Sequence, residues 1–123
     1  MGVTERQIDG QRAEALARAY LQDRGLDFVG ANFRTPFGEL DLIMREGESL
    51  VFVEVRYRRS ATFGGAAASV DRRKQMRLCR SAQYYLRGAA VGSQTPCRFD
   101  VVAISGNLER ASIDWLAGAF QAA

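Results

Sequence analysis

The stretch LVFVEVRYR, residues 50–58, decides the fold. Its first four residues form an unbroken apolar run of β-branched, aromatic and leucine side chains, which predicts a strand buried on both faces. Glu54 follows directly, and Arg56 comes two residues later. A carboxylate in such a strand is unfavourable unless a cation or a hydrogen-bond donor meets it. The stretch therefore predicts a central strand that carries a carboxylate with a partner.

The segments around this strand predict an α/β domain with the order α-β-β-β-α-β-β, spanning residues 1–123 as a single unit. Short links make the first three strands an antiparallel meander, and the second helix allows a parallel crossover to the fourth strand. The expected helices cover residues 4–24 and, after a cap at Ser69 or Asp71, the chain up to residue 87. The expected strands cover residues 26–34, 39–45, 50–57, 97–105 and 111–115, with a short tail after the last.

The hairpin before the central strand sets a register. If residues 46–49 form a four-residue loop, Arg45 lies opposite Leu50, and counting back places Asp41 opposite Glu54 and Glu39 opposite Arg56, all on one face. Carboxylates on directly opposite residues repel. A hard divalent cation such as Mg²⁺ or Mn²⁺ relieves that repulsion. An equally weighted alternative is an exposed strand end at which Glu54 pairs with Arg34 or Arg56.

Composition limits the chemistry. The chain has no histidine, which excludes Ser-His-Asp and Cys-His mechanisms and every zinc site that contains histidine. Residues 56–80 hold eight basic residues and one acid, a net charge of +7 in a chain of +3, so the remainder carries −4. Such a basic segment indicates either a localised anionic partner or a solvated helix face. The polar start and the lack of a long apolar run predict a cytoplasmic protein without membrane contact.

Four spaced motifs carry a family resemblance: GELDLI (residues 38–43), LVFVEVRYR (50–58), VDRRKQMRL (70–78) and RFDVVAI (98–104). With EALARAYL (14–21) and NFR (32–34), they resemble the YraN-like family of uncharacterised bacterial proteins over about residues 12 to 116. The resemblance implies a restriction-endonuclease-like fold, akin to archaeal Holliday-junction resolvases, with a mixed β-sheet flanked by helices. Resolvases of this fold act as dimers, so a homodimer stays open.

The resemblance also implies site residues. Asp41 matches the metal-binding aspartate of such nucleases and Glu54 the glutamate of their Glu-x-Lys motif, while Glu14 matches an assisting acid on the first helix. Arg56 occupies the lysine position, and arginine can stabilise charge but cannot give up its proton. The catalytic candidates are thus Glu14, Asp41, Glu54 and Arg56, with Mg²⁺ or Mn²⁺ on Asp41 and Glu54. The candidate contacts to DNA are Arg34, Arg58, Arg72, Arg73, Lys74 and Arg77.

Three functions stay open on this reading. The first is a metal-dependent endonuclease of the PD-(D/E)xK type that hydrolyses phosphodiester bonds, with branched DNA as one substrate. The second is a nucleic-acid-binding module that lost catalysis through Arg56. The third is an interaction domain whose basic helix meets an acidic protein.

Overall fold

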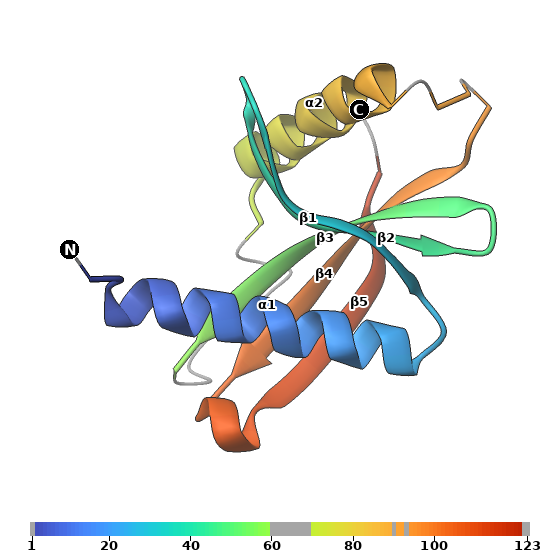
Figure 1. Ribbon diagram of the computed structural model, residues 1–123. Helices are drawn as coiled ribbons and strands as arrows, with labels where there is room; N and C mark the ends of the chain where they lie inside the picture. The colour runs from blue at the N-terminus through green and yellow to red at the C-terminus, as the bar shows by residue number, and fades with distance from the viewer. Residues whose placement is uncertain (1, 60–69, 90, 93, 122–123) are drawn as a thin grey trace.

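The computed structural model describes residues 2–59, 70–89, 91–92 and 94–121. The observed order of one helix, three strands, one helix and two strands confirms the predicted order (Figure 1). The elements are α1 (Glu5–Asp23), β1 (Asp27–Thr35), β2 (Gly38–Glu46), β3 (Ser49–Arg58), α2 (Arg72–Gly88), β4 (Cys97–Ser105), the 3₁₀ turn η2 (Leu108–Arg110) and β5 (Ser112–Phe120).

The five strands form one mixed sheet in the order β1-β2-β3-β4-β5. Neighbouring strands are antiparallel except β3 and β4, which are parallel as the intervening helix predicted. None of the helices among the described residues has both the length and the apolar character needed to cross a membrane.

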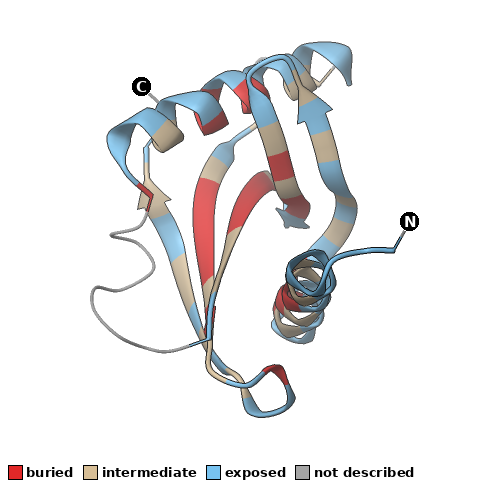
Figure 2. Ribbon diagram, turned by 90° about the vertical axis from the view of Figure 1, so that its left-hand side faces the viewer, coloured by how far each residue is buried: buried red, intermediate tan, exposed pale blue. Residues whose placement is uncertain are grey.

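The central strand β3 contributes to a core on each face of the sheet. Val51 and Val53 pack with α1 residues, whereas Leu50 and Phe52 pack with α2 residues. This two-sided burial explains the unbroken apolar run, because neither face of the strand meets water along residues 50–54 (Figure 2). Fixing β3 between the two helices also fixes Glu54, the next residue along the strand.

Each helix begins at a side-chain cap. Thr4 caps α1 and forms a capping box with Gln7. Asp71 caps α2 by accepting a hydrogen bond from the backbone N–H of Lys74 (2.8 Å), while the alternative cap, Ser69, lies outside the described residues. The cap therefore sets where α2 starts and how its first turn faces the sheet.

The β2–β3 hairpin confirms the predicted pairing of Arg45 with Leu50 but corrects the loop. Glu46 also pairs with Ser49, so the turn has two residues rather than four, and Gly47 takes the positive φ of 59° that such tight turns favour. The ladder ends at Leu42 and Val53. The pairs expected beyond that point do not form, because β2 bends away from β3.

The last strand is longer than predicted. We expected a strand over residues 111–115 and a tail, but β5 runs to Phe120. Two tertiary contacts hold the extra residues: the Phe120 ring stacks on Phe99 with centroids 4.9 Å apart, and the Gly118 N–H donates to Asp100 (2.9 Å). Neither contact can be read from local sequence.

Candidate functional site

The site forms where β2 leaves β3. Asn32 in β1 has a left-handed backbone with φ 54°, and Leu40 in β2 packs into the core on the α2 side. The β1–β2 hairpin curves toward α2, where Thr35 and Ser81 hydroxyls lie 2.8 Å apart (Figure 1). A cavity of about 800 Å³ opens in the space so created, and residues of α1, β2, β3 and α2 line it.

Asp41 lies at the point where the ladder stops. Its Oδ2 accepts a hydrogen bond from the backbone N–H of Val55 (2.9 Å). This side chain takes the place of a backbone carbonyl of β2, because the β2–β3 ladder has already ended at Leu42 and Val53. Burial, then the charge of Glu54 and a hydrogen bond between the two carboxyl groups, raise the pKa of Asp41 to about 8. At neutral pH Asp41 therefore keeps its proton, which reduces the repulsion between the two carboxyl groups.

Glu54 is buried, and two cationic side chains lie beside its carboxylate. Its Oε2 lies 3.2 Å from the Lys74 Nζ and 3.6 Å from the Arg56 Nη1, and only 4% of the residue is exposed. An isolated buried carboxylate would be strongly destabilising, so these two cations account for its presence in the strand. The alternative partner considered from the sequence, Arg34, instead lies 3.5 Å from Glu39.

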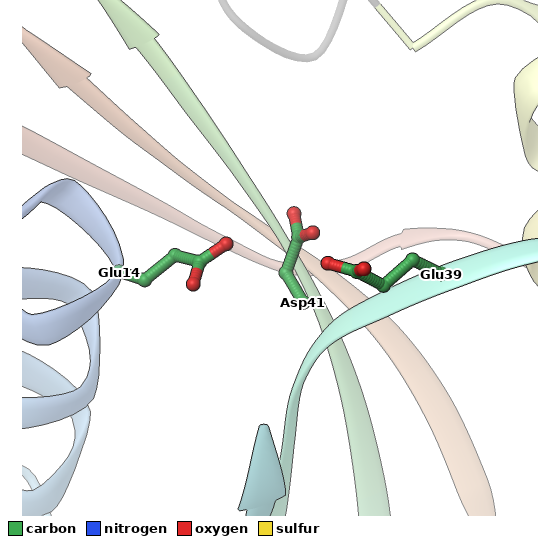
Figure 3. A group of neighbouring side chains, drawn as sticks. All are labelled: Glu14, Glu39 and Asp41. Atoms are coloured by element: carbon green, nitrogen blue, oxygen red, sulfur yellow. The ribbon is translucent and has the colours of Figure 1, made fainter. Parts of the chain in front are cut away.

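Glu14 and Glu39 complete an acidic cluster with Asp41. One carboxylate oxygen from each lies within 4.8 Å of the others, and Figure 3 shows the three groups pointing toward a common space from α1 and β2. With its amide nitrogen facing the carboxylates, Asn32 donates to Glu14 (3.0 Å) and Glu39 (3.1 Å). Burial raises the pKa of Glu14, the Asn32 hydrogen bond lowers it, and the charges of Glu39 and Glu54 raise it further.

The donor set fits a hard divalent cation. Every ligand offered by the cluster is a carboxylate oxygen, the type that Mg²⁺ and Mn²⁺ prefer. A cation there would offset the burial and the repulsion from Glu54 that together keep a proton on Asp41 at neutral pH. Asp41 is common to this cluster and to the pair with Glu54, which makes it the central ligand of any such site.

The structure brings all four predicted catalytic residues together. Glu14, Asp41, Glu54 and Arg56 all line the same cavity, and so do two residues predicted to contact DNA, Arg58 and Lys74. The other predicted DNA contacts, Arg34, Arg72, Arg73 and Arg77, are exposed outside it.

Sequence reasoning missed two residues of the site. Asn32 was noted within NFR but given no role, and Glu39 was placed on the face of Asp41 but not among the ligands. An asparagine tolerates a left-handed backbone better than most residues, so Asn32 was the available signal for a bend at this point. Lys74 was predicted only as a contact to DNA phosphates, and its proximity to Glu54, 3.2 Å away, was not foreseen.

Comparisons with known proteins identify the family of this chain. A family model described as uncharacterised protein family UPF0102 matches residues 13–104. The chain is 52% identical to a UPF0102 protein of Nitrosomonas europaea over 111 residues, covering 90% of this chain and 92% of that one. It is 51% identical to the UPF0102 protein YraN of Escherichia coli (strain SMS-3-5) over 112 residues, covering 90% and 82%. The chain therefore belongs to the UPF0102 family.

Proposed function

We propose that this protein is a nuclease-like DNA-binding protein that hydrolyses phosphodiester bonds with the help of Mg²⁺ or Mn²⁺. The observation that carries the proposal is the meeting of Asp41 and Glu54 at an open cavity, with further carboxylates on one side and cations on the other. Carboxylate ligands and nearby cations are what phosphodiester hydrolysis needs, because one set holds a metal ion and the other offsets the charge on phosphate.

The chain's own residues have distinct roles in this proposal. Asp41, which is paired with Glu54, would hold the cation together with Glu54, and Glu14 from the neighbouring carboxylate cluster would complete the oxygen ligands. Bound there, a divalent ion would lower the pKa of a water and polarise the phosphoryl oxygens. The water oxygen attacks phosphorus while the bond to the leaving sugar oxygen breaks, and that oxygen keeps the electron pair and takes a proton from solvent. Glu39, which is 38% exposed, can accept the proton that the water loses.

The basic surface of α2 supplies the DNA contacts. Arg72, Arg73 and Arg77 are exposed on the helix whose first turn also carries Lys74 into the cavity. DNA held through its phosphates along α2 would therefore present its backbone to the carboxylates. Contacts of this kind position DNA without reading its sequence.

Cleavage assays on duplex, branched and single-stranded DNA test the proposal. We expect the wild-type protein to cut at least one substrate with Mn²⁺, and Asp41→Asn, purified identically, to cut at least about 100-fold more slowly. Equal cleavage by both proteins would contradict the proposal, because the activity would not depend on the site.

Binding assays test the DNA surface. Charge reversal by Arg73→Glu with Arg77→Glu should weaken binding to all sequences alike and flatten its salt dependence. Arg110→Glu on η2 is the matched control, since Arg110 is exposed but lies outside α2. If no DNA binding is detected at about 50 mM salt, the function as an interaction domain for an acidic protein would be favoured instead.

A non-catalytic DNA-binding module is the second candidate. One observation favours it: both Lys74 and Arg56 already lie beside Glu54 Oε2, so that carboxylate has its charge compensated without an ion. This candidate predicts DNA binding that neither Mn²⁺ nor Asp41→Asn changes, together with no cleavage.

A further inference from the structure

The only lysine of the chain lies in the candidate site. Of 17 basic residues, 16 are arginine, and the exception is Lys74. Its backbone N–H is held by the Asp71 cap, which places it in the first turn of α2. Its side chain is 32% exposed, and the ammonium lies 3.2 Å from the buried Glu54 carboxylate. The neighbouring Arg72 and Arg73 are exposed instead.

Lysine and arginine do different work at such a position. A lysine ammonium is a compact point charge with three N–H donors, whereas a guanidinium is a planar fork. If one N–H of Lys74 points to Glu54, the other two are directed away from that carboxylate and can reach a group bound in the cavity. Arg56 approaches the same oxygen from β3 at 3.6 Å, so the two cations enter the cavity from different elements.

We propose that Lys74 is a catalytic residue that contacts the phosphate to be cleaved and donates to one of its non-bridging oxygens. The proposal rests on the proposed function. It gives a residue of α2 the charge-stabilising role in catalysis for which the sequence offered only Arg56 of β3. Lys74 keeps its protons throughout, while the water oxygen bonds to phosphorus and the sugar oxygen leaves with the electron pair. Charge that builds up on the phosphoryl oxygens is met by an ammonium that Glu54 already orients.

A spectroscopic test uses the fact that one lysine gives one signal. In protein labelled with ¹³C-lysine, the side-chain signal belongs to Lys74 without further assignment. We expect it to shift when DNA binds with Ca²⁺ in place of Mn²⁺, and to broaden when Mn²⁺ binds without DNA, because the ammonium lies beside the carboxylates. An unchanged signal in DNA-saturated protein would overturn the proposal, whether or not the protein cuts.

The kinetic test compares two variants of α2. Lys74→Met should lower kcat by about 100-fold, the effect of removing one charge-stabilising donor, with DNA affinity changed less than threefold. Arg87→Met, in the last turn of the same helix and outside the proposed DNA contacts, should leave both DNA affinity and kcat unchanged. Lys74→Arg keeps the charge and should recover part of the lost kcat.

The failures of the two proposals can be told apart. Wild-type kcat in Lys74→Met, or a loss confined to affinity, would overturn the role of Lys74 while leaving the nuclease proposal in place. Cleavage that is independent of Asp41 would overturn the nuclease proposal itself. Since Lys74→Met removes a cation from beside Glu54, the variant should bind Mn²⁺ at least as tightly as wild type, and weaker binding would indicate a merely structural role.

Discussion

Replacing Asp41 by asparagine should change how the stability of the protein depends on pH. The ordinary pKa of an aspartate is 3.8, and in the folded protein the value for Asp41 is about 8. Between these values the folded chain holds a proton that the unfolded chain has lost, so this group makes stability fall as pH rises. The fall begins near pH 4 and levels off above pH 8.

The size of the effect follows from the two pKa values. Integrating the linkage relation from pH 5 to pH 9 gives a loss of about 4 kcal/mol from Asp41 alone. Water in the open cavity screens part of this electrostatic effect. We therefore expect the measured free energy of unfolding to fall by at least about 1 kcal/mol between pH 5 and pH 9, or roughly 4 °C in Tm. An asparagine can accept the Val55 N–H and donate to Glu54 as the protonated carboxyl does, but it has no proton to lose.

The assay is urea unfolding followed by Trp115 fluorescence at pH 5, 7 and 9 with EDTA present. We expect Asp41→Asn to gain stability relative to wild type as pH rises, and Asp114→Asn, an exposed aspartate on β5, to show no such gain. Adding Mn²⁺ should stabilise wild type and not Asp41→Asn. Parallel pH profiles for wild type and Asp41→Asn would refute the burial argument.

Three further predictions concern the same region and its support. Titrating the protein with Mn²⁺ at pH 7 should release about one proton, from Asp41, and fewer at pH 9. The number of protons released follows from binding heats measured in buffers of different ionisation enthalpy. No proton release at pH 7 would contradict this prediction. Asn32→Gly should keep the left-handed backbone yet weaken Mn²⁺ binding, because it removes the amide that donates to the carboxylates. Asn32→Ala should in addition lose about 1 kcal/mol of stability. Calorimetry measures the binding and urea unfolding the stability, and unchanged Mn²⁺ binding in both variants would show that the Asn32 amide has no role in it. Asp100→Ala should cost about 2 to 3 kcal/mol in urea unfolding, because the buried Asp100 accepts hydrogen bonds from the half-buried Arg98 and Trp115, and a loss below 1 kcal/mol would mean that this network is not structural.

The fold and the centre of the site were predictable because both depend on local rules. The apolar run before Glu54 required a strand with two covered faces, and strand alternation placed Asp41 near Glu54 once the hairpin was located. The error in loop length left the register unchanged, because Glu46 and Ser49 simply added one more pair.

What could not be predicted depends on tertiary contacts. Helical spacing alone places Ile8, Ala15, Leu16, Ala19 and Tyr20 near one face of α1. In the structure Ile8, Ala15 and Ala19 are exposed, and the buried residues are Ala13, Ala17 and Leu21. Small alanines lie on several sides of this helix, so its pattern does not select a face. The inward reach of Lys74 depends on how α2 sits over β3, which no local pattern encodes.

The two separate cores have a consequence for partly folded molecules. Glu14 reaches the site only if α1 is docked on its core, and Lys74 only if α2 is docked on the other. If one helix detaches, the central strand can stay in the sheet, but the site loses the residue that this helix contributes. Any catalytic activity would therefore require both helices to be docked at the same time. On warming, activity should be lost when the first helix detaches, at a lower temperature than the circular-dichroism signal of the β-sheet.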